Sequence, residues 1–107
     1  MSQFSAKYNL KGKTSIILGG LGLIGWAITK SLINSGSKII ILDNDEKKWN
    51  IKKKQINIKK NQVKFLNLNL ADLDRLEKNF NKIINQINKF EILINASYPL
   101  TDDYKFN

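Results

Sequence analysis

The sequence predicts an α/β, Rossmann-type three-layer fold, in which helices cover both faces of a parallel sheet of about four strands. Three observations predict it. Short apolar runs alternate with helical patterns, a glycine-rich turn joins the first run to the first helix, and an acidic residue closes the second run. Such a sheet is expected to have right-handed crossovers and the strand order 3-2-1-4, with a ligand crevice at the carboxyl ends of strands one and four, where the order switches.

The first strand is expected at residues 13–18, after a turn, and the first helix at residues 22–35. Gly36 stands where a left-handed residue commonly ends a helix. Apolar and small residues at helical spacing predict which side of this helix is buried. This predicted stripe consists of Ile24, Ala27, Ile28, Ser31 and Leu32.

The second strand, at residues 38–42, is continuously apolar, as expected of a strand covered on both faces. Residues 45–60 are interpreted as a second helix, although lysine and asparagine dominate them. Its Trp49 is expected to pack against the sheet, since a buried indole is a more common role than base stacking. The third strand is expected at residues 63–66.

The third helix is expected at residues 72–89, with the side chain of Asp72 capping its first amides. A stripe of period 3.6 marks its buried side. The stripe consists of Leu73, Leu76, Phe80, Ile83, Ile84 and Ile87. The fourth strand follows at 91–95. Residues 1–9 are expected to form a lead-in, residues 96–107 a loop, and residues 1–107 together one truncated nucleotide-binding domain.

The glycine turn has the layout of a dinucleotide-binding strand–turn–helix unit. Gly19 would let the chain turn off the strand with backbone angles closed to other residues. Gly22 would let the backbone approach a pyrophosphate, and Gly25 would let the helix pack against the sheet. The amides and dipole of the helix would face the phosphates. The alternative is a tight turn without a ligand.

Asp43 follows the glycines by about 20 residues, the spacing at which an acidic residue binds the adenosine ribose. Its carboxylate would accept hydrogen bonds from the ribose hydroxyls and would repel a 2′-phosphate. The predicted cofactor is therefore NAD rather than NADP. Because the glycines, the flanking strands and Asp43 agree, a turn without ligand is the weaker interpretation.

The net charge of +9 raises the alternative of a basic nucleic-acid-binding module without a cofactor, because lysines crowd residues 47–60. A solvated helix face explains them equally, and Arg75 is the single arginine of the chain. Nucleic acid is therefore not favoured as a partner. The chain has no cysteine and no histidine, so neither disulfides nor a metal site is predicted. With no apolar leader or membrane-length run, a cytoplasmic location without membrane contact is expected.

Together these segments resemble the short-chain dehydrogenase/reductase family over nearly the whole chain. The shared segments are the lead-in 10–13, the glycine turn, Asp43, residues 69–72 and residues 91–97. The resemblance implies an oxidoreductase that transfers hydride between NAD(P) and a carbonyl or alcohol. Carried over residue by residue, it implies cofactor contacts at Gly19, Gly22, Leu23, Ile24, Gly25, Asp43, Asn69, Leu70, Asn95, Ala96 and Ser97.

The chain departs from the family pattern at several positions. Leu18 replaces a threonine and Leu23 replaces the middle glycine, so the turn reads Gly-Leu-Ile-Gly as in extended members. Asn69 stands where an aspartate commonly contacts adenine. A fragment of a sugar-nucleotide epimerase or dehydratase is therefore an alternative within the family. The Asn95-Ala96-Ser97 segment resembles the dehydrogenase pattern more closely.

Members of the family use a tyrosine as general acid and base, with a lysine four residues later. None of Tyr8, Tyr98 and Tyr104 has such a lysine, so no catalytic residue is predicted in this chain. The sequence is interpreted as the amino-terminal NAD(P)-binding half, catalytically incomplete by itself. A small-molecule substrate would bind only after completion by a carboxyl-terminal half, and full-length members are usually homo-oligomers.

Overall fold

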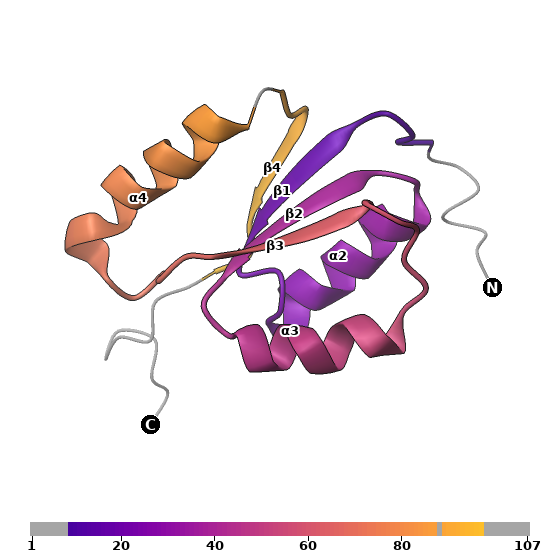
Figure 1. The fold of residues 1–107 in the computed structure, drawn as a ribbon, viewed down its shortest axis with the longest axis horizontal. Helices are drawn as coiled ribbons and strands as arrows, with labels where there is room; N and C mark the ends of the chain where they lie inside the picture. The colour runs from indigo at the N-terminus through magenta and orange to yellow at the C-terminus, as the bar shows by residue number, and fades with distance from the viewer. Residues whose placement is uncertain (1–8, 88, 98–107) are drawn as a thin grey trace.

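The computed structural model describes residues 9–87 and 89–97, which form a parallel four-stranded sheet in the order β3-β2-β1-β4 (Figure 1). The strands are β1 (Thr14–Leu18), β2 (Lys38–Asp43), β3 (Val63–Asn67) and β4 (Ile92–Asn95). The predicted order 3-2-1-4 is confirmed, and each strand lies within one residue of its predicted bounds. The expected lead-in at 1–9 and loop at 96–107 lie largely outside the described residues.

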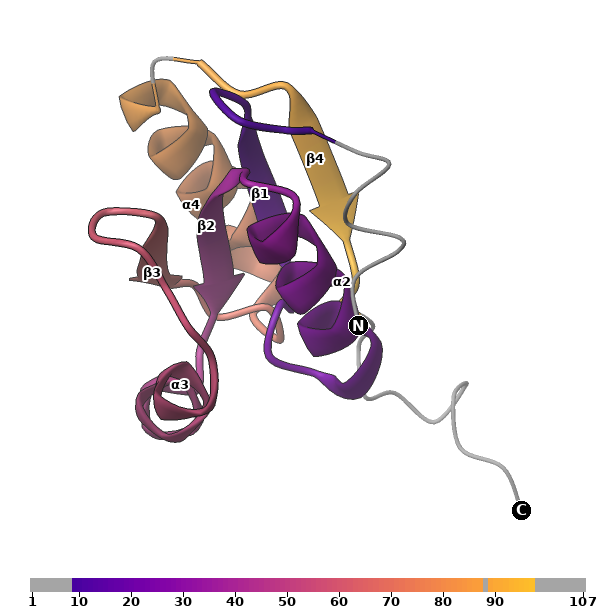
Figure 2. The ribbon, with the colours of Figure 1, turned by 90° about the vertical axis from the view of Figure 1, so that its right-hand side faces the viewer.

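The helices form two layers around this sheet. Helix α2 (Leu23–Asn34) and helix α3 (Glu46–Lys52) lie on one face, and α4 (Leu73–Gln86) lies on the other (Figures 1 and 2). A short 3-10 turn, η1 (Lys53–Gln55), follows α3. The three-layer Rossmann-type architecture is therefore as the sequence predicts.

Successive residues of β1 point to opposite faces of the sheet, and each face has its own apolar cluster. Ile17 belongs to the cluster under α2 and α3, where its buried partners are Leu21, Trp26, Ile33, Ile39, Ile41 and Trp49. Ile16 belongs to the cluster under α4, together with Leu18, Leu42 and Leu68. The central strands β1 and β2 are thus covered on both faces, which explains their uninterrupted apolar sequences.

The buried side of α2 differs from the predicted stripe. The buried residues are Gly25, Trp26, Thr29 and Ile33, whereas Ile24 is 64% exposed. Ala27 and Ser31 are exposed too, while Ile28 and Leu32 are only half-buried. The prediction weighed hydrophobicity alone. The close approach of the helix at Gly25 turns this residue toward the sheet, and the positions one, four and eight residues later follow it.

Helix α3 is shorter than the predicted span of 45–60. The Asp45 side chain caps it by accepting from the Lys48 amide at 3.0 Å, but the helix ends at Lys52. Beyond η1 the backbone becomes extended at Ile56, and both Ile56 and Ile58 pack against the cluster under α2. Apolar residues two positions apart share a face only in an extended chain, so burial of both isoleucines opposes a helix here.

Trp49 packs against the sheet as predicted. It is 8% exposed, and its ring stacks on that of Phe65 in β3 with 6.1 Å between centroids and 10° between planes. Such offset aromatic pairs add to the free energy of burial. Trp49 therefore anchors the short α3 to the edge strand of the sheet.

Helix α4 shows the predicted stripe except at its first residue. Leu76, Phe80, Ile83, Ile84 and Ile87 pack against the second cluster, but Leu73 is 64% exposed. Asp72 occupies the N-cap position without the predicted side-chain hydrogen bond. The helix ends at Gln86 rather than 89, because Ile87 turns extended and Phe90 joins the same cluster on the way to β4.

Two further features tie the amino ends of the strands together. Gly36 ends α2 with φ +90°, as predicted, and its amide donates to the carbonyl of Ile33 at 3.0 Å. The buried hydroxyls of Ser15 and Ser37 lie 2.7 Å apart and link β1 to the start of β2.

Strand β4 pairs with β1 alone and forms one edge of the described sheet, with Leu93 48% exposed on it.

Glu91 gives the junction of β1 and β4 a dependence on pH. Its carboxylate accepts a hydrogen bond from the Thr14 amide at 2.8 Å and lies 3.5 Å from the Lys89 ammonium group. The Thr14 bond is the main reason that the pKa of Glu91 lies below its ordinary value of 4.5. Desolvation opposes this shift, and the charge of Lys89 adds to it.

A carboxylate whose pKa is lower in the folded state stabilises the fold above its unfolded pKa, and this stability is lost as the pH falls through the folded pKa. We therefore expect E91Q to unfold with a weaker dependence on pH than the unaltered chain. Urea denaturation at neutral pH and at a pH below 4.5 measures this. Parallel pH profiles for the two proteins would contradict the assignment.

Candidate functional site

The turn between β1 and α2 lies where the strand order changes direction. Gly19 adopts φ +72°, a conformation that side chains rarely allow, so the expected backbone geometry at this position is confirmed. Its amide donates to the carbonyl of Leu42 in β2 at 2.8 Å, and the Gly22 amide donates to the Gly19 carbonyl at 3.2 Å. The turn is therefore fixed by β2 and by its own backbone.

Strand β4 ends directly against this turn. A Cβ on Gly19 would lie 2.8 Å from the amide nitrogen of Ser97, and the Ala96 amide donates to the carbonyl of Leu18 at 2.8 Å. The side-chain oxygen of Asn95 accepts from the amide and the hydroxyl of Ser97. Asn95, Ala96 and Ser97 are thus brought to the glycine turn, with Asn95 bonding to its local chain.

Gly25 lets the helix approach the turn. A Cβ at this position would lie 2.0 Å from the Gly19 carbonyl oxygen, a separation that no side chain tolerates. Only glycine fits unless α2 moves away from β1. The need for glycine here lies in the packing of the fold itself.

Gly22 is different, because nothing in the described structure requires it to be glycine. Its backbone is extended, with φ −70°, and an added Cβ would meet only the Gly19 carbonyl oxygen at an ordinary 3.6 Å. It is the N-cap of α2, whose first amides have no partner within the helix. Leu23 and Ile24 follow it in the first turn of α2, and their side chains are 92% and 64% exposed. The space above Gly22 is therefore open.

Asp43 ends β2 with its carboxylate directed at the glycine turn. One oxygen accepts from the Leu21 amide at 3.3 Å and the other from the Asn44 amide at 2.7 Å. The residue is half-buried, so part of the carboxylate remains accessible beside the turn. The structure thus brings Gly19, Gly22 and Asp43 to one end of the sheet.

The segment after β3 lies next to this end of the sheet. The Leu68 amide donates to the Asp43 carbonyl at 3.0 Å. Asn69 is exposed, and its side-chain oxygen accepts from the Ala71 amide at 3.0 Å. Leu70 is half-buried against the cluster under α4. Asn69 therefore caps its own turn, and Leu70 contributes to packing there.

Two residues that sequence reasoning missed hold the turn in place. Leu21 is 1% exposed and fills the space beneath the turn, while its amide bonds to Asp43. The buried hydroxyl of Thr29 lies 2.7 Å from the Gly25 carbonyl and 3.1 Å from that of Gly20, and can donate to either. A lone leucine among glycines and a threonine four residues after Gly25 are the sequence signals that indicate these roles.

Comparison with known proteins identifies the family. The short chain dehydrogenase family model matches residues 13–99. An uncharacterized oxidoreductase, C736.13, of Schizosaccharomyces pombe is 28% identical over 89 residues, which are 81% of this chain and 26% of that protein. A short chain dehydrogenase/reductase, dpchG, of Colletotrichum higginsianum is 23% identical over 86 residues, or 80% of this chain and 32% of that protein.

Solved structures have the same fold. A candidate D-mannonate oxidoreductase of Haemophilus influenza, solved with bound NAD, superposes with a TM-score of 0.67 at 24% identity, covering 98% of this chain and 41% of that one. The MalC reductase/Diels-Alderase of Malbranchea aurantiaca superposes with a TM-score of 0.67 at 20% identity, covering 91% of this chain and 40% of that one. None of the helices formed by the described residues has the length and apolar character needed to cross a membrane.

The chain spans between about a quarter and a third of the curated relatives it matches, and about two fifths of these two solved chains. The matched part contains the glycine turn, Asp43 and all four described strands. The family is one of oxidoreductases that bind NAD(P). This chain belongs to the short-chain dehydrogenase/reductase family and corresponds to the amino-terminal, NAD(P)-binding portion of its fold.

Proposed function

We propose that this chain binds NAD at the carboxyl ends of β1, β2 and β4, as the nucleotide-binding portion of an enzyme that transfers hydride. The observation that carries the proposal is the open space at Gly22, where the fold itself tolerates a Cβ at 3.6 Å. A glycine that the fold does not need is expected where a ligand approaches the backbone closely. The residue is therefore best explained by a bound pyrophosphate.

The charges and dipoles of the turn suit such a ligand. The first amides of α2 and the positive end of its dipole face the space above Gly22. The first turn of α2 contains no acidic side chain that would repel a phosphate. Leu23 and Ile24 add exposed apolar surface beside it. A bound cofactor would accept or donate the hydride, and these residues would bind and orient the cofactor.

Asp43 makes NAD the preferred cofactor. Its carboxylate is held at the turn by the Leu21 and Asn44 amides, so it cannot easily move away from a ribose bound there. A ribose with two free hydroxyls can donate to it, whereas a 2′-phosphate would place a second negative charge against it. We propose further contacts of the cofactor with the Asn69–Leu70 segment and with residues 95–97.

We expect this chain by itself to bind the cofactor without catalysing hydride transfer, since its sequence contains no Tyr-x-x-x-Lys. A carbonyl or alcohol substrate would then require the remainder of a family fold. A cytoplasmic location and assembly into homo-oligomers also stay predictions.

Calorimetric titration of the whole chain with NAD and NADP tests the proposed function. We expect saturable binding of NAD with one site per chain, and at least roughly tenfold weaker binding of NADP, a difference of about 1.4 kcal/mol. ADP-ribose serves as a control for the adenosine and pyrophosphate contacts alone. Absence of saturable binding for all three compounds would contradict the proposal.

Replacing Asp43 by asparagine is expected to relax the choice between the two cofactors. The amide oxygen of the variant can still accept from the Leu21 amide, so the turn keeps its support while the negative charge is removed. NADP affinity should rise relative to NAD by about tenfold, equal to about 1.4 kcal/mol. The same titrations measure it. An unchanged affinity ratio in D43N would show that this carboxylate does not face the ribose.

A further inference from the structure

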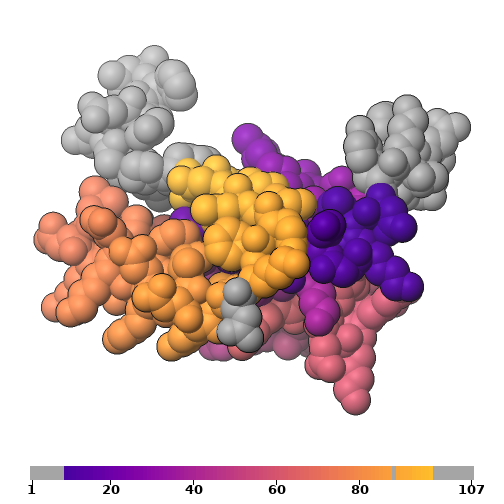
Figure 3. All heavy atoms as spheres, turned by 90° about the horizontal axis from the view of Figure 1, so that it is seen from above, coloured from indigo at the N-terminus to yellow at the C-terminus, as the bar shows by residue number. Residues whose placement is uncertain are grey.

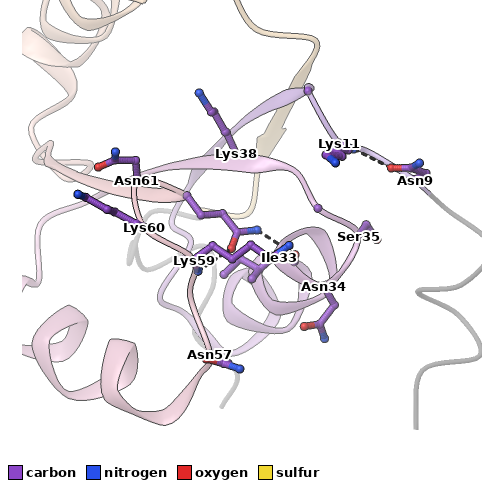
Figure 4. A pocket seen from close by; sticks show the side chains of 13 residues that line it. Asn9, Lys11, Ile33, Asn34, Ser35, Lys38, Asn57, Lys59, Lys60 and Asn61 are labelled. Atoms are coloured by element: carbon purple, nitrogen blue, oxygen red, sulfur yellow. Dashed lines mark hydrogen bonds between the residues drawn. The ribbon is translucent and has the colours of Figure 1, made fainter.

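We propose a second ligand site, a cavity at the amino ends of β1, β2 and β3 that binds a small anion with several phosphate groups. The cavity has a volume of about 950 Å³ and lies at the opposite end of the sheet from the glycine turn. Three chain segments enclose it, namely residues 9–12, the end of α2 with the start of β2, and residues 57–62 (Figure 4). Its volume lies near the upper end of the range of ligand pockets, about 300–1,000 Å³.

The charge around this cavity has one sign. Of the described residues that line it, four are lysines, Lys11, Lys38, Lys59 and Lys60, and none is acidic. The sequence has no aspartate or glutamate between residues 9 and 42 or between residues 47 and 71. Clefts lined by one sign of charge concentrate counter-ions. The cavity should therefore attract anions.

The carboxylate of Glu91 does not neutralise these lysines. It lies at the amino end of β4, next to the same end of the sheet, but it does not line the cavity. Its oxygens are engaged by the Thr14 amide at 2.8 Å and by the Lys89 ammonium group at 3.5 Å. No carboxylate thus stands beside the cavity lysines among the described residues that line it.

The floor of the cavity is formed before any ligand binds. The Gln62 side-chain nitrogen donates to the carbonyls of Ile33 at 3.0 Å and Ser37 at 3.1 Å, while its oxygen accepts from the Lys59 amide at 3.2 Å. The Leu10 amide donates to the carbonyl of Ser35 at 2.7 Å. These bonds tie the three enclosing segments to one another, so little backbone ordering would oppose binding.

The end of α2 would ordinarily repel an anion, but the carbonyl groups of Leu32 and Ile33 are already paired. The Gly36 amide donates to Ile33 at 3.0 Å, the Ser37 amide donates to Leu32 at 3.1 Å, and Gln62 adds its bond to Ile33. The negative end of a helix dipole resides on unpaired carbonyls. Its opposition to an anion is thereby reduced.

The lining chemistry selects phosphate groups over nucleic-acid bases. Lysine ammonium groups bind phosphate as point charges, and the side-chain amides of the lining asparagines offer further donors, from Asn9, Asn34, Asn57 and Asn61. Among the described residues, no aromatic side chain lines the cavity, whereas single-stranded nucleic acids are bound largely by stacking on aromatic rings. A compact anion with consecutive phosphates therefore fits better than an oligonucleotide.

Four lysines line the cavity. Figure 4 shows the Lys38 and Lys60 side chains extending outward from its rim, so their ammonium groups would have to turn inward to reach a common ligand. The view onto the amino ends of the strands shows the indigo segment that begins at Asn9 and the pink segment around residue 60 on the same side of the molecule (Figure 3). Flexible lysine stems allow all these ammonium groups to turn toward a common ligand.

Calorimetric titration with inorganic tripolyphosphate tests the site, using the whole chain and two variants of equal net charge. The first variant is K38Q/K59Q/K60Q at the cavity. The second is K53Q/K78Q/K82Q, whose exposed lysines lie on η1 and α4 and do not line the cavity. We expect the cavity variant to bind at least tenfold more weakly and the control variant to bind like the unaltered chain. Amide chemical shifts should change at residues 35–38 and 59–62.

Three results would overturn the proposal. They are no saturable binding of tripolyphosphate, equal losses in both variants, or shift changes confined to the glycine turn, where the anion would be occupying the cofactor position. A further titration uses single-stranded oligodeoxythymidylate in place of tripolyphosphate. Tighter binding of this oligonucleotide than of tripolyphosphate, lost in the cavity variant, would replace the small anion by nucleic acid. NAD binding should be equal in all three proteins, which separates this site from the proposed function.

Discussion

Replacing Gly22 by aspartate is expected to weaken NAD binding strongly while the fold becomes slightly more stable. The added Cβ meets only the Gly19 carbonyl oxygen at 3.6 Å, so the side chain fits without moving the backbone. The carboxylate would occupy the space proposed for the pyrophosphate and would repel it. We expect NAD affinity to fall at least about a hundredfold, or roughly 2.7 kcal/mol.

The fold should tolerate this change because of the local backbone. Gly22 is the N-cap of α2, in extended geometry, and has no side-chain cap. Aspartate is a preferred N-cap residue and interacts favourably with the positive end of the helix dipole. Relative to glycine it is expected to add a few tenths of a kcal/mol to the free energy of unfolding. Binding and stability should therefore change in opposite directions.

Calorimetric titration with NAD and urea denaturation measure the two effects on the same samples. N81D is a matched control, since it adds the same charge at an exposed position on α4, far along the chain from the turn. It should bind NAD like the unaltered chain. If G22D retained full affinity, the cofactor would not lie above this residue.

The topology, and the gathering of Gly19, Gly22 and Asp43 at one end of the sheet, were predictable because they depend on local sequence. The glycines, the apolar strands and Asp43 follow one another along 31 residues, from Lys13 to Asp43, and each acts on neighbours within the same strand–turn–helix–strand unit. The strand order is then the one typical of the dinucleotide-binding fold that this unit indicates. The positions of Gly19, Gly25 and Asp43 in the structure agree with what their residue types require.

The errors concern features that only tertiary packing decides. The predicted buried side of α2 was wrong because it was chosen by hydrophobicity alone. Gly25 and Thr29 are buried for steric and hydrogen-bonding reasons rather than for their apolar surface. The end of α3 depends on Ile56 and Ile58 reaching the cluster under α2 as an extended chain. The cavity at the amino ends joins segments about 50 residues apart in sequence, so no local pattern could indicate it.

Gly22 and Gly25 look alike in the sequence but have different reasons to be glycine. Gly22 leaves open space at the surface of the turn, whereas Gly25 avoids a clash with the Gly19 carbonyl oxygen inside the fold. The proposed cofactor would explain the first, whereas packing of α2 against β1 explains the second without any ligand. Substitution by alanine, the smallest possible change, therefore separates cofactor binding from folding at two positions three residues apart.

Replacing Gly25 by alanine is expected to unfold the chain. Its Cβ would lie 2.0 Å from the Gly19 carbonyl oxygen and 2.9 Å from the Gly19 carbonyl carbon, which are backbone atoms held by β1 and β2. Helix α2 would have to move away, which exposes Trp26 and Ile33 and stretches the hydrogen bond from Thr29 to Gly20. We expect a loss above about 4 kcal/mol, a magnitude that only severe steric or packing defects reach.

A graded series of alanine variants makes this prediction specific. At Gly20 a Cβ would meet the Ile41 methyl group and the Thr29 hydroxyl at 3.1 Å, and at Gly22 it would meet only an oxygen at 3.6 Å. The loss of unfolding free energy should therefore be largest in G25A, intermediate in G20A and smallest in G22A. Urea denaturation followed by circular dichroism measures it, and tryptophan emission should shift to the red in G25A as Trp26 becomes exposed. Equal denaturation midpoints for G25A and G22A would show that the helix is not held against the turn at the distance described. The cofactor crevice, which depends on that contact, would then need a different geometry.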